Sequence, residues 1–186
     1  EDLMTDDLSN GSNSPDFRLD IPEGDDRTRR ICNNCNFIDY VNPRIVAGSV
    51  VTRDDKILLC RRAIEPRKGF WTLPAGFMEE NETVEDAARR EAQEEACADI
   101  RISQLLAVYS VPRISQVQVM FRASLASDIA AGPESLEVGL FAWKDIPWSE
   151  LAFPTVVWAL THYSGTRHLH GFPPFTNPPG TESLTR

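Results

Sequence analysis

Residues 76–95 read GFMEENETVEDAARREAQEE, and the second part of this stretch predicts a helix over residues 83–96. Thr83 is a suitable N-cap, acidic residues follow it in the first turn, and alanines recur after that. Glu91, Glu94 and Glu95 are spaced three and four residues apart on this helix. The spacing places their carboxylates along one side of the helix, and we call these three residues the acidic ridge.

The acidic ridge has two explanations. Like charges at these spacings destabilise an exposed helix by roughly 0.2–0.5 kcal/mol per pair. Either the ridge is solvated and screened, or a cation compensates its charge. Three glutamates taken alone favour the solvated face, but hard carboxylate oxygens also suit Mg²⁺ or Mn²⁺.

The residues that flank the ridge resemble the signature of the Nudix hydrolase family. Gly76 is followed after five residues by Glu82, and after seven more by Arg90, which directly precedes the ridge. The resemblance implies an α/β fold, the Nudix α/β/α sandwich, in which a mixed β-sheet lies between helices and the acidic helix lines the cleft. It also implies an Mg²⁺-dependent (or Mn²⁺-dependent) enzyme that splits the pyrophosphate bond of a nucleotide.

The resemblance also assigns roles to the matching positions. Gly76 permits the tight turn before the helix and belongs to the metal site, whose ligands are the acidic ridge. Glu82 pairs with Arg90 and braces the helix. This pair, together with Glu94 and Glu95, makes up the catalytic set that the signature implies.

Two positions depart from the signature. Cys97 stands where the family has glycine, and Ala98 stands where it has a bulky apolar residue. The helix must therefore end without the conformational freedom of glycine, which affects stability more than metal ligation.

The attacking water needs a proton acceptor. A ridge residue such as Glu94 could take this role, or a glutamate from a later loop, Glu134 or Glu137 in the stretch GPESLE at 132–137. Glu137 is our candidate from that loop, and the alternative is that both loop glutamates are merely solvated.

A nucleotide diphosphate offers anionic oxygens and flat rings. The candidates for contacts with its phosphates are Arg62, Arg67 and Arg113. Phe70 or Trp71 could stack on a ring. Each of these residues taken singly is more often a surface or core residue. The histidines, His162, His168 and His170, favour structural or solvated roles.

The first part of the chain is acidic and rich in Asp, Ser, Asn and Gly, so we predict that residues 1–29 are largely disordered. Residues 30–44 contain Cys32 and Cys35 and look like the end of the small zinc ribbon that precedes some Nudix domains. The other cysteine pair of such a ribbon is missing, since residues 9–18 contain no cysteine. One pair cannot close a structural zinc site, and we assign no zinc. The pair is then a vestige, a turn with free thiols, or half of a site completed by another chain.

Residues 45–165 are predicted to form the Nudix domain. A β-branched stretch at 45–52, a polar turn at 53–55 and an apolar stretch at 56–61 indicate a hairpin. Further strands are expected at 105–111, 116–123 and 138–143, and an apolar helix at about 155–163. The tail at 166–186 is rich in proline and is expected to be irregular.

Several stretches between residues 21 and 163 resemble ADP-ribose/FAD diphosphatases, which release AMP. FAD and ADP-ribose are therefore the expected substrates. An NAD(H) pyrophosphatase is the alternative, although the Pro-rich aromatic stretch of that group is not obvious at 108–116. An alternative of another class is a catalytically silent nucleotide-binding sensor on a Nudix fold.

Composition restricts the partners. A net charge of −9 at pH 7 and a pI of about 4.8 disfavour nucleic acid, whose binding depends on Lys and Arg displacing counterions. No uncharged apolar run of about 18 residues occurs, so no membrane partner is expected. The acidic start resembles neither a signal nor a transit peptide, so a cytoplasmic location is expected, with organelle import left open if the start is a processed one. Homodimers are common in the family that the chain resembles.

Overall fold

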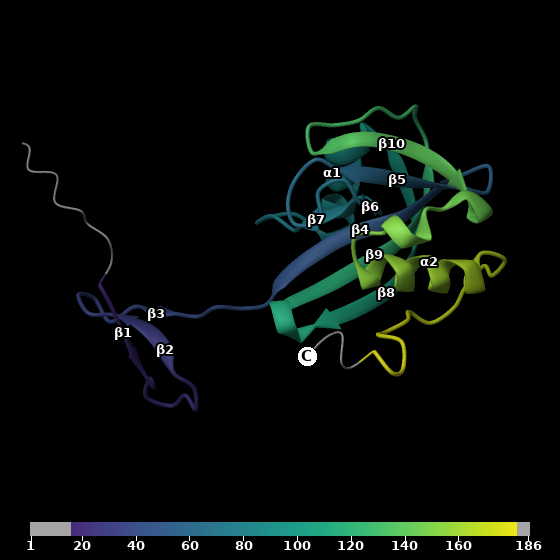
Figure 1. Cartoon of the computed structure of the whole chain (residues 1–186). Helices are drawn as coiled ribbons and strands as arrows, with labels where there is room; N and C mark the ends of the chain where they lie inside the picture. Colours follow the sequence, from purple (N-terminus) through teal and green to yellow (C-terminus); the bar gives the residue numbers. More distant parts are fainter. Residues whose placement is uncertain (1–15, 182–186) are drawn as a thin grey trace, which may run out of the picture. The chain divides into compact units, whose positions relative to one another are not determined.

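The computed structural model describes residues 16–181 (Figure 1). The chain divides into two compact units, Glu1–Asn42 and Pro43–Arg186, and each is described by itself. The predictions for residues 1–15 and 182–186 lie outside the described residues.

The first unit contains a small antiparallel sheet in the order β1-β2-β3. Its strands are β1 (Phe17–Asp20), β2 (Arg29–Cys32) and β3 (Ile38–Asp39). The prediction that disorder extends to residue 29 is therefore wrong for residues 16–29. Composition indicates little apolar burial in this stretch, but β1 pairs with β2 and charged side chains make further contacts. The guanidinium carbon of Arg30 lies 4.4 Å from the ring centroid of Phe17, and Arg29 Nε lies 2.9 Å from a carboxylate oxygen of Asp25.

The second unit contains a mixed sheet in the order β10-β5-β4-β9-β8, with β6 paired to β5 and β7 paired to β4. Its strands are β4 (Arg44–Arg53), β5 (Lys56–Arg62), β6 (Trp71–Thr72), β7 (Ala75–Phe77), β8 (Ile100–Val111), β9 (Gln116–Leu125) and β10 (Ser135–Ala142). The central pair, β4 and β9, is parallel. The predicted hairpin is confirmed as β4 and β5. Its turn residues Asp54 and Asp55 both have positive φ, 50° and 59°, as two-residue hairpin turns of type I′ require.

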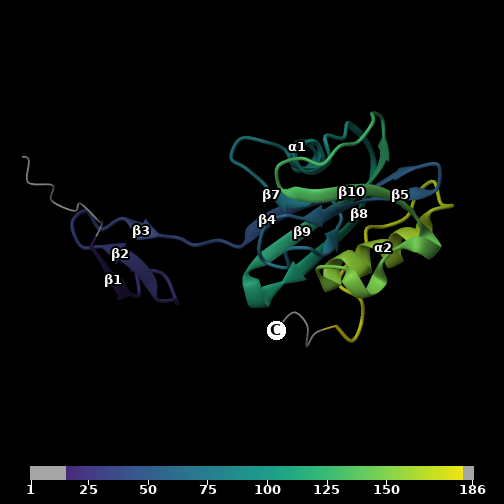
Figure 2. The same cartoon turned by 45° about the horizontal axis from the view of Figure 1, so that its top comes forward.

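Two helices cover opposite faces of this sheet (Figure 2). They are α1 (Val84–Ala96) and α2 (Pro154–Thr166), and short 3₁₀ turns are η1 (Pro112–Ile114), η2 (Trp143–Asp145) and η3 (Trp148–Glu150). The arrangement confirms the predicted α/β/α sandwich with a mixed sheet. Among the helices of residues 16–181, none is long and apolar enough to cross a membrane.

α1 begins where it was predicted to begin, because Thr83 Oγ accepts a hydrogen bond from the N–H of Asp86 at 3.1 Å. Buried alanines let this helix lie close to the sheet, and they are Ala87, Ala88, Ala92 and Ala96. On the other face, α2 packs through larger apolar side chains such as Trp158 and Leu160. The α1 layer therefore packs on the sheet through small side chains, and the α2 layer packs on it through large ones.

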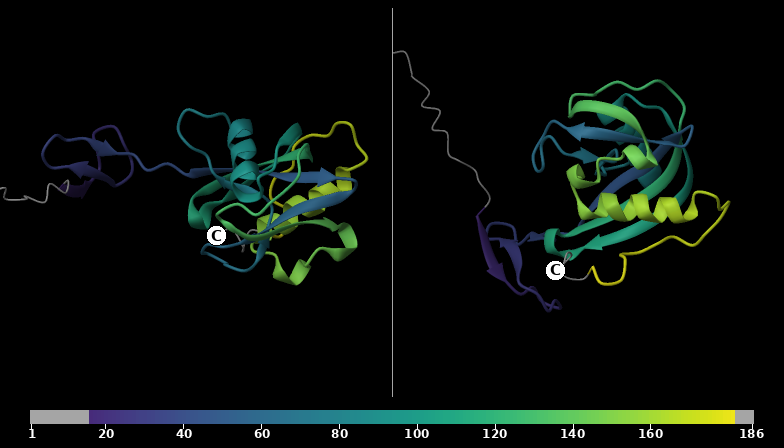
Figure 3. Two further views of the ribbon diagram at one scale, coloured as in Figure 1. Left: turned by 90° about the horizontal axis from the view of Figure 1, so that it is seen from above. Right: turned by 45° about the vertical axis from the view of Figure 1, so that its right-hand side comes forward.

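The described part of the proline-rich tail, residues 167–181, is irregular, as predicted, and belongs to the second unit. After α2 the chain turns back (Figure 3), and the N–H of Phe175 donates to the carbonyl of Leu106 at 2.9 Å. The Phe175 ring stacks on His162 with centroids 4.2 Å apart, and His162 Nδ1 lies 2.7 Å from the Tyr109 hydroxyl. His162 thus has the predicted structural role, and the tail covers β8, the strand at the edge of the sheet.

α1 ends at Cys97, where the signature has glycine. Cys97 has a φ of 48°, in the left-handed region, and its N–H donates to the carbonyl of Gln93 at 2.9 Å. The N–H of Ala98 donates to the carbonyl of Ala92 at 3.1 Å. The helix therefore makes the usual left-handed C-terminal turn, but with a side chain that is strained there.

We predict that Cys97→Gly raises the free energy of unfolding by about 1 kcal/mol, because glycine adopts this φ without a side-chain clash. Urea denaturation measures the change. Cys97→Ser keeps a Cβ at the same φ and is the control, for which no gain is expected. Equal stability of the two variants would contradict the strain argument.

Candidate active site

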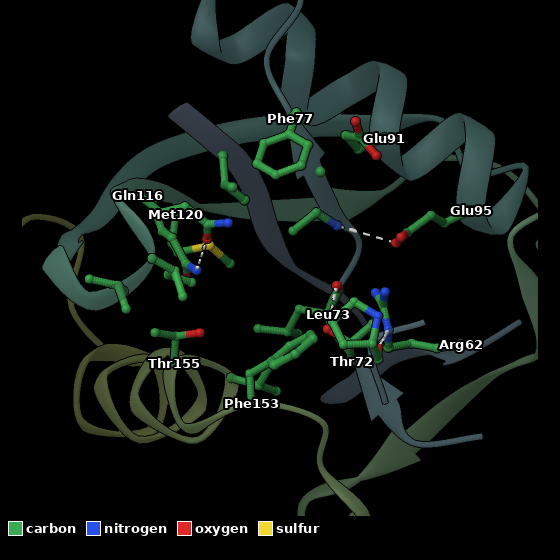
Figure 4. Close-up of a pocket in the computed structure, with 18 of the residues that line it drawn as sticks. Arg62, Thr72, Leu73, Phe77, Glu91, Glu95, Gln116, Met120, Phe153 and Thr155 are labelled. Carbon is green, nitrogen blue, oxygen red and sulfur yellow. Dashed lines mark hydrogen bonds between the residues drawn. The ribbon is translucent and has the colours of Figure 1, made fainter. Parts of the chain in front are cut away.

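A cleft of about 540 Å³ lies in the second unit between α1, the sheet and the N-terminal end of α2. Figure 4 shows Glu91 and Glu95 of α1 on one side of the cleft and Phe153 and Thr155, at the start of α2, on another. Met120 of β9 adds to the floor between them. The cleft is therefore acidic along α1 and mostly apolar elsewhere.

α1 buries two residues of the acidic ridge and exposes the third. Glu91 and Glu95 are 7% and 5% exposed, because residues four apart lie on the same helix face, here the face toward the sheet. The Glu94 side chain is 56% exposed. The N–H of Ala75, on β7, donates to Glu95 Oε2 at 3.2 Å, which fixes that carboxylate against the strand.

Arg90 holds the carboxylates of this region together. Its Nε and Nη2 donate to the two oxygens of Glu82 at 3.1 and 2.8 Å, so the brace implied by the signature is present. Its Nη1 donates to Glu91 Oε1 at 2.7 Å and to Glu94 Oε2 at 2.9 Å. These hydrogen bonds lower the pKa of Glu82 and raise that of the guanidinium.

Burial dominates the protonation of the two inner carboxyls. Desolvation raises the pKa of Glu95 to about 8, and the charge of Glu91 adds to the shift. Desolvation also raises the pKa of Glu91, although the hydrogen bond from Arg90 opposes it. Both carboxyls therefore resist ionisation unless a further positive charge lies beside them.

Two glycines permit close approaches at the ridge. A Cβ on Gly76 would collide with the Glu91 carboxylate, and a Cβ on Gly132 would collide with the carbonyl oxygen of Glu94. The N–H of Gly132 also donates to the carbonyl of Glu95 at 3.1 Å. The loop that precedes β10 therefore rests on the end of α1.

The donor set of the cleft fits a hard divalent cation. Carboxylates are its metal-binding side chains, and no thiol or imidazole is among the residues that line it. Within residues 16–181 no three His, Cys, Asp or Glu side chains already converge on one point. Arg90 Nη1 engages one oxygen of Glu91 and one of Glu94, so these two oxygens face the guanidinium instead. A cation would relieve the repulsion between the buried Glu91 and Glu95.

The structure places Glu134, and not Glu137, in the cleft. The charge of Glu134 contributes to the raised pKa of both Glu91 and Glu95, which shows that it lies near them. Glu137 lies on β10 and is 3.6 Å from Arg61, and both side chains are exposed. The candidacy of Glu137 is therefore corrected. A break in strand register between Ser135 and Glu137, which the sequence does not reveal, separates the two glutamates.

Of the predicted substrate-binding residues, some line the cleft and others lie outside it. Arg62 and Arg113 line the cleft. Arg67 does not, since its Nε donates to the carbonyl of Ala152 at 3.1 Å and its guanidinium carbon lies 4.1 Å from the ring centroid of Phe70. Trp71 is a core residue, packed edge-on against Phe141 with centroids 4.8 Å apart. Among these four positions, the structure brings only the two cleft arginines to the site.

Several residues of the cleft were not foreseen. Phe153 lies directly before α2, with its ring centroid 5.3 Å from the guanidinium carbon of Arg62. Gln116, Gln118 and Met120 alternate along β9 and point into the cleft. Polar residues at alternate positions of an otherwise apolar strand were the available signal for the two glutamines.

An acidic helix thus lies on the wall of a cleft, within an α/β/α sandwich. Residues 42–159 match the NUDIX domain family, and residues 14–41 match the Nudix N-terminal family, a zinc ribbon. The chain belongs to the Nudix family and is a Nudix hydrolase.

Three relatives illustrate the similarity. A NUDIX hydrolase from Nitrosomonas europaea, known from a crystal structure, is 48% identical to this chain in sequence. The two structures align with a TM-score of 0.81, over 88% of this chain and 93% of the other. The ADP-ribose pyrophosphatase of Methanocaldococcus jannaschii is 34% identical over 119 residues, which are 61% of this chain and 69% of that protein. The NAD-capped RNA hydrolase NudC of Enterobacter sp. is 33% identical over 123 residues, 63% of this chain but 46% of that protein. The chain thus spans less than half the length of NudC.

We predict that the metal-free protein loses stability as the pH rises from about 4.5 toward about 8. The folded state holds the Glu95 proton more tightly than the unfolded chain, so the stabilisation is present at low pH and is lost as the carboxyl ionises. Glu95→Gln should remove most of this dependence and should be the more stable protein at pH 8 in the presence of a chelator. Urea denaturation at pH 5.5 and pH 8 measures both effects.

Glu94→Gln is the matched control for that experiment, because it makes the same change at the exposed position of the ridge. It should leave the pH dependence of stability unchanged. The same slope with pH in the unsubstituted protein and in Glu95→Gln would refute the assignment of the dependence to Glu95.

Proposed function

We propose that this hydrolase splits the pyrophosphate bond of ADP-ribose, FAD or both, with Mg²⁺ or Mn²⁺ as cofactor, and releases AMP. The observation that supports this most is that one cleft combines the acidic ridge with Arg62 and Arg113. A diphosphate needs both a cation held by carboxylates and guanidinium donors for its remaining oxygens.

Glu91, Glu94 and Glu95 would hold the cation, with Gly76 beside them. When bound, the cation neutralises charge on the diphosphate and lowers the pKa of a coordinated water. Glu82 keeps Arg90 in place through two hydrogen bonds, whichever partner the ridge carboxylates take. α1 therefore stays anchored while the charge on its ridge changes.

Glu134 is the proton acceptor that the cleft best supports. It lies on a loop that docks on the end of α1 through Gly132, and the N–H of Ala63 donates to its carbonyl at 2.8 Å. Its backbone is thus fixed on two sides, while its carboxylate lines the cleft beside the ridge. A positioned carboxylate at this place can take a proton from the attacking water.

The apolar part of the cleft suits the organic half of a nucleotide. Phe153 offers a ring face next to Arg62, so a base or sugar packed on the ring would carry its phosphate toward the guanidinium. The volume of about 540 Å³ is in the range of small-molecule sites. Similarity to a protein named ADP-ribose pyrophosphatase supports ADP-ribose, and similarity to one named NAD-capped RNA hydrolase supports NAD(H) as the second candidate.

The substrate is tested by incubating the purified protein with Mg²⁺ and, separately, with ADP-ribose, FAD, NADH and a nucleoside triphosphate. We expect AMP together with ribose 5-phosphate from ADP-ribose, or AMP together with FMN from FAD, as measured by chromatography. Preference for NADH would favour the second candidate. Tight binding of ADP-ribose without hydrolysis would favour the silent sensor. Size-exclusion chromatography of the same sample tests whether the chain forms a homodimer.

Glu134→Gln should lower kcat by about 10²–10⁴-fold with little change in KM, because it removes a proton acceptor and keeps the shape of the side chain. Glu137→Gln, the matched change three residues further along the chain, on β10 and exposed, should leave kcat unchanged. Glu95→Gln should abolish Mg²⁺-dependent turnover in the same assay. If instead Glu137→Gln is the slow variant, the assignment of Glu134 is wrong.

A further inference from the structure

The first unit does not fit the zinc that its family implies. A structural zinc site closes with four thiolate or imidazole ligands. Residues 1–42 contain two cysteines, Cys32 and Cys35, and no histidine. A single chain therefore supplies half of the ligands of a zinc ribbon.

Protein contacts join the cysteine-bearing turn to β1 in place of a metal. Arg18, on β1, donates from Nη1 to Asn33 Oδ1 and from Nη2 to Asn36 Oδ1, each at 3.2 Å. The N–H of Asn33 donates to the carbonyl of Asp16 at 2.8 Å. Asp16 and Arg18 belong to residues 9–18, the stretch in which the missing cysteine pair is expected. Hydrogen bonds thus connect the turn to β1 without the two absent ligands.

The two cysteines lie three residues apart within one turn. Cys32 ends β2 and is buried, whereas Cys35 is exposed. Hydrogen bonding from the Cys35 and Asn34 backbone and from the Cys35 thiol is the main cause of a lowered pKa at Cys32. The N–H of Asn36 donates to the carbonyl of Cys32 at 2.9 Å and closes the turn. The lowered pKa favours the thiolate form of Cys32.

We propose that Cys32 and Cys35 form a reversible dithiol–disulfide pair and that the first unit carries no zinc. The oxidant is a low-molecular-weight disulfide such as oxidised glutathione. The exposed Cys35, as its thiolate, attacks one sulfur of this disulfide, and one small thiol leaves after taking a proton. The Cys32 thiolate then attacks the Cys35 sulfur of the mixed disulfide, and the second small thiol leaves. The protein loses two electrons and two protons, and the small disulfide gains them.

The full-length protein tests this proposal in mixtures of reduced and oxidised glutathione. Free thiols are trapped with an alkylating reagent, the protein is digested, and the peptides are identified by mass spectrometry, while elemental analysis gives the zinc content. The expected result is one disulfide bond between Cys32 and Cys35, which accounts for two of the four thiols. An excess of reduced glutathione should reverse it, and the protein should carry no zinc.

Cys97 is the matched control within the same chain, because it is exposed and the preceding cysteine in the sequence is Cys60, which is buried. It is expected to retain a bound glutathione where it reacts, since no second thiol displaces it. Cys32→Ser removes the second attack, so glutathione should then accumulate on Cys35. The contrast separates a true dithiol pair from two independently reactive thiols.

Other outcomes overturn the proposal. Zinc at one atom per chain, with both thiols shielded from alkylation, would show a metal site. Zinc at one atom per two chains would show a site shared between two copies. Glutathione that remains on Cys35 of the unsubstituted protein would show that the pair does not close. Hydrolysis of nucleotides is not a readout here, so the result is independent of the proposed function.

Discussion

The packing of α1 in the second unit depends on Arg90, whose positive charge compensates the carboxylates of this acidic helix and of Glu82. One guanidinium makes hydrogen bonds of 2.7–3.1 Å to Glu82, Glu91 and Glu94, and it also donates to the carbonyl of Phe77 at 2.9 Å. Burial strengthens the repulsion between carboxylates and the attraction to the cation alike. Breaking such a network by removing one partner leaves an uncompensated buried charge. The orientation of the Glu82, Glu91 and Glu94 carboxylates therefore follows from this single side chain.

Small residues allow the acidic ridge to lie close to the sheet. The alanine face of α1 allows a close approach, and Gly76 leaves room for the Glu91 carboxylate where any side chain would collide with it. Gly132 does the same for the loop that carries Glu134. The site is therefore inseparable from the packing of the fold, because the residues that set the spacing between helix, strand and loop also set the spacing between functional groups.

Features that depend on residues close together in the sequence could be predicted from it. The start of α1 was predictable because Thr83 caps it by a bond to a residue three positions on, and the β4–β5 hairpin was predictable from its polar turn. The position of Trp71 in the core depends on Phe141, which is far away in the sequence. Glu134 rather than Glu137 enters the cleft, and a break in strand register lies between the two; Phe153 joins the cleft through the packing of α2. Residues 16–29 are joined by the pairing of β1 with β2, by an ion pair and by a cation–π contact, none of which hydrophobic composition can predict.

The return of the tail along β8 has a consequence for assembly. An edge strand presents unpaired N–H and C=O groups that can template pairing with another chain. Phe175 takes up the carbonyl of Leu106 and the N–H of Val108, and its ring is stacked on His162. A polypeptide cut after α2 would keep all the residues of the cleft but would uncover this edge. Such a truncated protein would retain its active-site residues but would aggregate through the exposed edge strand.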